Sequence, residues 1–427
     1  MALGKGLSTA GHRVTLCTSL KFKPFVTAHG LEYAYLNNDL IEFMHSDAGK
    51  LVMEKAGNLV ETLWAAARTM PSMGSMARRQ IRDSWEATTA SKPDLILYHP
   101  KAFFAREFAE RLDVPCIFAF YLPLYVPTGE FPAMGIPNLH LGPWFNRFSY
   151  RVVSKATWWG IGKYANEWRL SNGLPARSAG KYLERANGEP IPALHAFSKW
   201  VIPEPSDWPS TASVTGYWFL DPSDEWDPSP ELQDFLSRGK PPVYFGFGSI
   251  FGSDPSRLAG LVLRAVEEAG VRAIIARGWG GLAPALTQSS KDVLVIESAP
   301  HDWLFPKVDA VVHHGGCGTT AAGLRAGRPA IICPLFGDQP FWGKKVEELG
   351  AGTPPIAQKK LTVGNLAAAI REVTTNHSIH EKAARIGRLI QAEDGVSNAV
   401  QFIDSFMQDS RQSNLRTEAQ KRRDLQE

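Results

Sequence analysis

The chain has little cysteine and no marked excess of charge. Its four cysteines, Cys17, Cys116, Cys317 and Cys333, stand singly among 427 residues, and no CxxC pair occurs. This spacing argues against a metal site and favours a reducing, cytoplasmic environment. The formal net charge is only +3, and no long cluster of lysine and arginine alternates with aromatic residues. We therefore expect no nucleic-acid partner.

Long hydrophobic runs are also missing. The beginning, MALGKGLSTAGHRV, has no apolar core of signal-peptide length. The most apolar run, Val114 to Val126, is interrupted by Pro123 and is too short to cross a bilayer. A hydrophobic content of 44% is ordinary for a globular protein. The length exceeds that of one typical domain, so two domains are expected.

Short apolar runs alternate with helical patterns along the whole chain. This alternation predicts an α/β protein with parallel sheets built from βαβ units. The predicted strands are 12–18, 93–99 and 114–120 in the first half, and 241–248, 271–277, 292–298, 309–314 and 329–334 in the second. Between the halves, LDPSDEWDPSP (220–230) has the composition of a linker. We place the domains at 1–220 and 221–395, followed by a helix at 396–412 and a polar tail at 413–427.

The most informative stretch is 311–343, VVHHGGCGTTAAGLRAGRPAIICPLFGDQPFWG. An apolar strand ends in two histidines, a glycine-rich turn follows, and Thr319 and Thr320 open a small-residue helix. Free backbone N–H groups and a helix N-terminus meet at this turn, and they favour an anion such as phosphate. The next strand leads to Asp338 and Gln339, whose side chains suit sugar hydroxyls. Phosphate at one strand end and sugar at the next predict a nucleotide-sugar site.

With this stretch the chain resembles the UDP-dependent glycosyltransferases of family 1, in particular the sterol 3-beta-glucosyltransferase branch. The likeness continues in SAPHDWLFP, which begins at Ser298, and upstream in YHPKA, PLYVPTGEFP, VTGYWFLD and VYFGFGSI. The resemblance implies the GT-B fold, in which two Rossmann-like domains face each other across a cleft. It implies a nucleotide sugar in the C-terminal half and the acceptor in the N-terminal half. It also implies that the helix at 396–412 crosses back to the first domain.

The resemblance also implies roles for individual residues. The diphosphate would be surrounded by His314, Gly316, Gly318, Thr319 and Thr320. Ala299 and His301 would hold the base and ribose, and Asp338 and Gln339 the sugar. Ser249 would add a donor to phosphate, although its position after a strand equally suits a helix N-cap. No metal or other cofactor is expected, because in this fold type a helix terminus usually takes the place of the metal. Ala322 stands where plant relatives carry a glutamate for the ribose, so ribose recognition is expected to differ.

The acceptor-side base is less clear from the residues. Sterol-type relatives begin with a strand and a GSRGDVQP-type loop ahead of an ALGKGL-like helix, whereas the printed sequence begins inside that helix. We expect this strand and loop, with its acidic residue, to be missing. His99, at the end of the strand 93–99, is then a candidate for the base or a base-supporting residue. The alternative is a histidine satisfied by nearby backbone.

The segment from Tyr121 to Trp168 is rich in proline and aromatic residues, and within it we expect residues 123–150 to be irregular. Three interpretations are open. The segment shapes a pocket for a flat, apolar alcohol, its aromatic residues form core or domain interface, or it includes a helix that lies peripherally on a membrane.

We expect an inverting glycosyltransferase that moves a hexose, glucose from UDP-glucose, onto a hydroxyl of a sterol or another lipophilic alcohol. One alternative is a nucleotide-sugar-binding pseudoenzyme or truncated isoform. Another is a glycosyltransferase of a terpenoid or polyketide secondary metabolite. A hydrolysing UDP-sugar epimerase would need extra carboxylates near the anomeric carbon, and the sequence shows no such cluster.

Overall fold

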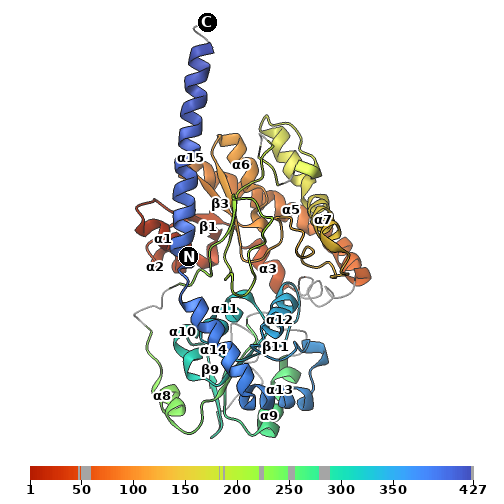
Figure 1. Ribbon diagram of the computed structural model, residues 1–427. Coiled ribbons are helices and arrows are strands. Elements are labelled where there is room, and N and C mark those ends of the chain that lie inside the picture. Colours follow the sequence, from red (N-terminus) through yellow and green to blue (C-terminus); the bar gives the residue numbers. More distant parts are fainter. Residues whose placement is uncertain are drawn as a thin grey trace.

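The protein is described from a computed structural model, shown in Figure 1. The structure describes residues 1–46, 49, 59–181, 183–185, 188–220, 226–248, 255–277 and 289–424, and of 59–73, 255 and 413–424 only the backbone. Ser249 and residues 221–225 of the predicted linker therefore lie outside the described residues.

Two sets of parallel strands form the cores of the two halves. The strands are β1 (Thr15–Ser19), β2 (Glu32–Leu36), β3 (Ile96–Tyr98), β4 (Cys116–Phe120), β5 (Ala193–His195), β6 (Ala212–Val214), β7 (Val243–Gly246), β8 (Ala273–Ala276), β9 (Val293–Ile296), β10 (Ala310–His313) and β11 (Ala330–Ile332). All eight predicted strands are confirmed. The strands β2, β5 and β6 were not predicted.

Helices connect and cover these strands. They are α1 (Ala2–Thr9), α2 (Lys23–Ala28), α3 (Asp39–His45), α5 (Leu59–Ser91), α6 (Ala105–Leu112), α7 (Gly142–Ser171), α8 (Pro230–Ser237), α9 (Pro255–Ala269), α10 (His301–Leu304), α11 (Cys317–Arg325), α12 (Gln339–Glu348), α13 (Val363–Thr375), α14 (His377–Gln391) and α15 (Gly395–Asp424). Short 3-10 turns include η1 (Leu20–Phe22) and η3 (Ala179–Lys181). In the part of the chain that the structure describes, no helix is both long enough and apolar enough to cross a membrane.

The C-terminal sheet has the strand order β11-β10-β7-β8-β9, with every pair parallel. Its strands are apolar almost throughout because helices cover both faces. Val312 and Phe245 point into a core closed by α9 and α13. Their neighbours Val311 and Tyr244 point to the other face, where Leu304 and Phe305 cover them. The carboxyl ends of these strands, where ligands bind in open α/β sheets, meet at one edge.

The N-terminal half contains the parallel sheet β3-β4-β5-β6 and a separate parallel pair, β1-β2. The strands β5 and β6 have only three residues each, one of them polar, so no continuous apolar run marks them in the sequence. Phe118 and Phe120 of β4 point to one face of the larger sheet. Ile117 points to the other face, where it packs with Leu194 and with Ile403 of α15.

The last helix, α15, joins the two ends of the chain. It packs against α1 and buries Ala399 and Ile403 against the N-terminal sheet. The Asn398 side-chain nitrogen donates to the Thr215 carbonyl at 2.9 Å, and His12 lies 2.8 Å from Asp404. Figure 1 shows α15 rising from the C-terminal half alongside the N-terminal half.

The helix α7 corrects the expectation for the aromatic segment. We expected residues 123–150 to be irregular, but from Gly142 onward they belong to one helix that continues to Ser171. The proline-rich composition indicated a loop, but Pro143 lies in the first turn of the helix. Proline is well tolerated in the first turn of a helix, where its missing N–H has no intrahelical partner to lose.

Candidate functional site

The glycine turn after β10 is built as the sequence indicates. Gly315 has a φ of +89°, a left-handed conformation that favours glycine. Its N–H donates to Nδ1 of the fully buried His313 at 3.1 Å, which fixes the turn. Gly316 is the N-cap of α11, and no side chain caps this helix end. The N-terminus of α11 is therefore available to an anion.

Two glycines enclose the ring of His314. A Cβ at Gly316 would lie 2.5 Å from Nε2 of His314, and a Cβ at Gly248 would lie 2.8 Å from its Cε1. Both distances are shorter than a van der Waals contact, so only glycine fits at either position. Burial lowers the pKa of His314, and this outweighs the opposing effects of the Gly246 carbonyl and Asp338. The ring is thus held neutral between the β7 loop and the α11 turn.

The two threonines of the motif do different things. Thr319 lines the pocket at the start of α11. The Thr320 hydroxyl is buried and donates to the Gly316 carbonyl at 3.0 Å, inside the helix. A hydroxyl has one proton to donate, so in this arrangement only Thr319 offers a donor to a phosphate. Gly318 is exposed on the first turn of the helix.

Asp338 and Gln339 lie at the start of α12, directly after β11. Asp338 Oδ2 accepts from Trp342 Nε1 at 3.0 Å, which leaves the other carboxylate oxygen for a ligand. Gln339 Oε1 accepts from the backbone N–H groups of Leu335 and Phe336 at 2.7 and 3.2 Å. The amide oxygen of Gln339 thus shapes the loop that carries Asp338.

The start of α11 borders a pocket of about 500 Å³, which Thr319 lines but Asp338 and Gln339 do not. This volume is within the usual range for a ligand site. On the C-terminal side the pocket is lined by Ala299, His301 and Thr319, as the sequence predicted, together with Tyr244, Gly246, Gly248, Ala276, Glu297 and Ser298. The ring of His301 stacks on Phe305 with centroids 4.4 Å apart. Burial lowers the pKa of His301 to about 4, so the ring is neutral near pH 7.

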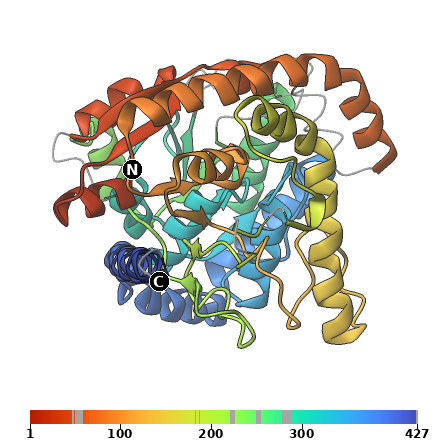
Figure 2. The ribbon, with the colours of Figure 1, turned by 90° about the horizontal axis from the view of Figure 1, so that it is seen from above.

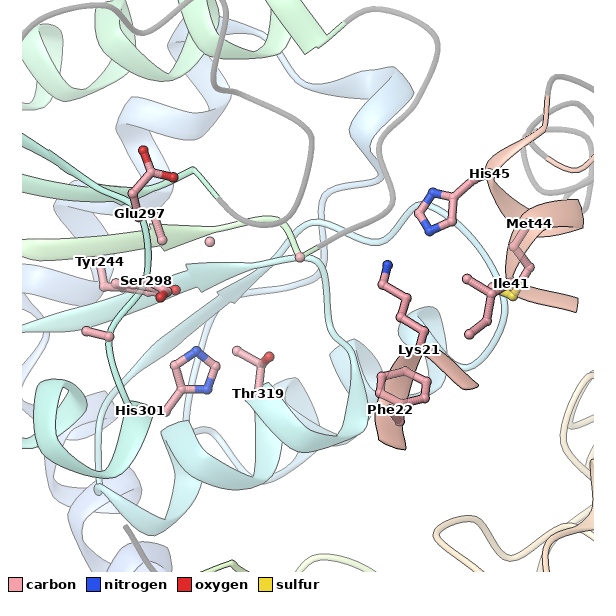
Figure 3. Close-up of a pocket in the computed structure, with 14 residues that line it drawn as sticks. Lys21, Phe22, Ile41, Met44, His45, Tyr244, Glu297, Ser298, His301 and Thr319 are labelled. Atoms are coloured by element: carbon pink, nitrogen blue, oxygen red, sulfur yellow. The ribbon is translucent and has the colours of Figure 1, made fainter. Parts of the chain in front are cut away.

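The N-terminal half supplies the opposite wall, which the sequence did not indicate. Figure 3 shows Lys21 and His45 on one side of the pocket, facing Thr319 and His301 on the other. Phe22, Ile41 and Met44 line the same wall. Lys21 therefore brings a positive charge into a pocket that the positive end of α11 also borders. Two positive groups on opposite walls favour an anion between them.

His99 lies apart from this pocket, at the end of β3. Its Nδ1 accepts from the Lys101 N–H at 3.1 Å, and burial and the Lys101 charge lower its pKa to about 4. The ring is therefore neutral near pH 7 and carries its proton on Nε2. It packs edge-on against Phe120 and stacks with Tyr121, with centroids 5.9 Å apart. Burial raises the pKa of Tyr121, and the Asp338 carboxylate adds to the rise. Since Asp338 belongs to the C-terminal half, His99 and Tyr121 lie near the sugar-side residues.

No group of three or more histidine, cysteine, aspartate or glutamate side chains with metal-binding geometry occurs within the described ranges. The prediction that the site works without a metal stays a prediction.

Comparisons with known proteins agree with this geometry. Residues 270–400 match the erythromycin biosynthesis protein CIII-like C-terminal domain family. Over 94% of its length the chain is 36% identical to a sterol 3-beta-glucosyltransferase of Emericella nidulans, covering 28% of that protein. It is 35% identical to the enzyme of that name from Saccharomyces cerevisiae, over 97% of this chain and 34% of that protein. The chain thus spans about a third or less of the length of these curated relatives.

Solved structures show the same fold. The glycotransferase of kitacinnamycin superimposes with a TM-score of 0.68 at 20% identity, over 95% of this chain and 94% of that one. CalG4, the calicheamicin glycosyltransferase, gives a TM-score of 0.65 at 19% identity, over 96% of this chain and 94% of that one. The spinosyn rhamnosyltransferase SpnG, in complex with thymidine diphosphate, gives 0.59 at 18% identity, over 94% and 95%. The two halves are thus arranged as in the GT-B fold.

Proposed function

We propose that the chain belongs to the UDP-dependent glycosyltransferases, in their sterol 3-beta-glucosyltransferase-like branch, and that it moves a hexose from a nucleoside diphosphate onto a lipophilic alcohol. The donor is UDP-glucose, and the acceptor is a sterol or a related alcohol. The names of the relatives support glucose as the transferred sugar and a sterol as the acceptor. The SpnG complex supports a nucleoside diphosphate as ligand of this fold.

The observation that carries the proposal is the pocket at the N-terminus of α11. Its walls divide into an aromatic end, where His301 and Tyr244 suit a base, and a positively charged end, where Thr319 and Lys21 suit a diphosphate. A base-sized apolar wall and an anion site within one pocket of about 500 Å³ fit a nucleoside diphosphate.

The reaction is a single displacement. The acceptor oxygen bonds to the anomeric carbon while the bond from that carbon to the phosphate oxygen breaks, and the configuration inverts. The diphosphate leaves as an anion, which the N-terminus of α11 stabilises. Lys21 and Thr319 assist it, so we propose that no metal is needed. The hydroxyl proton passes to water during the attack, so the products are the glucoside, UDP and one proton.

His99 is the proposed contact for the acceptor oxygen. Because its Nδ1 accepts from Lys101, Nε2 is the N–H side of the neutral ring and donates. His99 then orients the acceptor hydroxyl and supports a base rather than taking the proton itself. We also propose that the protein works in the cytoplasm, which its four free cysteines support, in peripheral contact with a membrane that holds the acceptor.

The test is an assay of purified protein with UDP-glucose and ergosterol or cholesterol held in cyclodextrin. We expect a sterol glucoside and UDP in equal amounts. Asp338→Asn serves as the comparison, because the asparagine side-chain oxygen can still accept from Trp342 while the negative charge is lost. We expect this variant to bind UDP like the parent but to transfer the sugar more slowly. If UDP binds but no glucoside forms with either sterol, the transfer proposal fails. If UDP itself does not bind, the donor site is wrong as well.

A further inference from the structure

The outer face of α7 carries large apolar side chains in water. Leu141, at its N-cap, and Trp144, Phe148, Val152 and Trp159 are 62, 75, 44, 41 and 84% exposed. Their spacing of three, four, four and seven residues places them on one face of a helix. Trp144 and Phe148 stack with centroids 5.4 Å apart and planes 4° apart. A continuous exposed apolar stripe of this kind marks an interaction surface.

The charged residues of the same helix are mainly basic. Between Gly142 and Ser171 the basic residues are Arg147, Arg151, Lys155, Lys163 and Arg169, and the acidic residue is Glu167. Glu167 is bound by Arg78 at 2.9 Å, and Arg147 is bound to Asp207 at 2.6 Å. Arg151 and Lys155 are exposed, and by helical spacing they flank the apolar stripe. The surface is therefore apolar and aromatic at its centre and positive at its edge.

An apolar pocket opens beside this surface. It has a volume of about 470 Å³, and α7 contributes Tyr150, Arg151, Ser154 and Lys155 to its wall. The remaining wall is mainly apolar and comes from the N-terminal half: Phe118, Tyr125, Val126, Pro127, Ala179, Gly180, Leu183, Glu184, Pro190, Ile191, Ala193, Pro209, Thr211 and Ala212. Arg151 and Lys155 thus border both the pocket and the exposed stripe.

The pocket and the cleft adjoin through aromatic side chains. Phe118 lines the pocket and lies 6.1 Å from Phe120, centroid to centroid. Phe120 in turn lies 4.9 Å from the ring of His99. The same sheet face therefore leads from the α7 pocket to the residue proposed to contact the acceptor oxygen.

We propose that the exposed face of α7 docks on an anionic lipid bilayer and that the adjoining pocket receives the apolar body of the acceptor from it. The second part rests on the proposed function. Aromatic and aliphatic side chains flanked by lysine and arginine are the pattern of a helix that lies in a membrane interface. Anionic lipids complement Arg151 and Lys155. Figures 1 and 2 both place α7 along the outer edge of the N-terminal half, away from α15.

Sedimentation with phosphatidylcholine vesicles, with and without phosphatidylserine, tests the docking. We expect binding to the vesicles with phosphatidylserine, weakened by salt. The double variant Trp144→Ser/Trp159→Ser and the double variant Arg151→Glu/Lys155→Glu should each bind about tenfold more weakly or worse. Trp200→Ser is the matched control, because Trp200 is 43% exposed but lies outside α7, and it should bind like the parent.

Docking is overturned if the parent binds neither vesicle, or if both double variants bind as the parent does. It is also overturned if the tryptophan variant instead abolishes a concentration-dependent dimer seen by sedimentation velocity, because the stripe would then join two copies of the chain. UDP affinity, measured on every variant, shows that the fold is intact.

Delivery of the acceptor gives the second readout. The tryptophan variant should glucosylate sterol held in vesicles about tenfold more slowly, by a rise in apparent KM, and sterol held in cyclodextrin at the parent rate. Ser154→Phe, which narrows the pocket, should weaken binding of a fluorescent sterol and leave vesicle binding unchanged. Equal losses with vesicles and cyclodextrin, or normal sterol binding by Ser154→Phe, contradict the route. Vesicle and sterol binding could behave as expected while neither the parent nor any variant makes glucoside. The proposed function then fails, and the docking surface stands.

Discussion

Nε2 of His314 occupies the space that a side chain on Gly316 would need: a Cβ there would stand 2.5 Å away. Gly316→Ala should therefore displace the ring and distort the α11 turn. Overpacking of this kind costs about 1–3 kcal/mol, so we expect UDP to bind about tenfold more weakly by calorimetry. Gly318→Ala is the control, since a Cβ at Gly318 meets nothing within 4 Å. Similar losses in both variants would show that any side chain in the turn is harmful and that the His314 contact is not the reason.

Lys21 should bind the diphosphate across the cleft. A hydrogen bond to a charged group contributes about 1.5–3 kcal/mol, so Lys21→Gln should weaken UDP about tenfold or more. Uridine, which has no phosphate, should bind as before. Lys23→Gln is a matched control, because the Lys23 ammonium lies over the Tyr33 ring, 5.8 Å from its centroid. An equal loss of uridine affinity would contradict a contact with the diphosphate.

Substitutions of the two neighbouring threonines should affect UDP affinity differently in the same assay. Thr319→Val removes a hydroxyl that lines the pocket and should weaken UDP about tenfold. Thr320→Val removes a hydroxyl that donates to Gly316 within the helix. A neutral hydrogen bond contributes as little as about 0.5 kcal/mol, so UDP affinity should change less than threefold. A larger effect of Thr320→Val would mean that its hydroxyl turns to the ligand when the ligand binds.

His99 should act as a donor in its neutral form. Because its pKa is lowered to about 4, the rate of transfer should show no break from this residue near pH 6.5 and should fall only as the pH approaches 4. His99→Gln keeps an N–H donor and should retain more activity than His99→Ala, which we expect to be about tenfold slower. If both variants lose roughly a hundredfold or more, the scale typical of general base catalysis, His99 is the base.

Buried neutral histidines should make the fold sensitive to mild acid. Burial lowers the pKa of His195 to about 3 and that of His301 to about 4. An unfolded histidine has a pKa of about 6.5, so below that pH the unfolded chain binds more protons and stability falls as the pH falls. Urea unfolding at pH 7 and pH 5 should show the loss. In His195→Phe the loss of unfolding free energy between pH 7 and pH 5 should be smaller by about 2 kcal/mol. An unchanged pH dependence in this variant would contradict the burial of a neutral ring.

The local parts of the site could be predicted because their chemistry lies in continuous sequence. The turn from His313 to Gly318 folds within one strand–helix unit, and glycines between a strand and a helix indicate a tight turn. Lys21 and His45 could not be found in this way. They come from η1 and α3. Their position opposite Thr319 depends on how the two halves pack, and a local sequence pattern does not predict this packing. Thr320 was assigned to phosphate because its hydroxyl is in the right turn, but the direction of its side chain is set by helix geometry.

The strands were predicted wherever the apolar run was long enough. The strands β5 and β6 were not predicted because a polar residue, His195 in β5 and Ser213 in β6, interrupts each short apolar run. The helix α7 was missed in part because the composition of its first turns, with Gly142, Pro143 and Trp144, is that of a loop. Its exposed apolar face also gives it a weak helical pattern, since apolar residues lie on both its inner and its outer side.

The packing of α15 on α1 determines how the protein can be divided. A cut in the linker would not release an N-terminal half that folds alone, because Ile117 and Leu194 would lose the cover that Ile403 provides. Two fragments separated there should instead reassemble only when expressed together, with α15 as the connecting piece. The order of folding during synthesis follows the same logic: the first half of the chain to leave the ribosome must wait for the last helix before its core is closed.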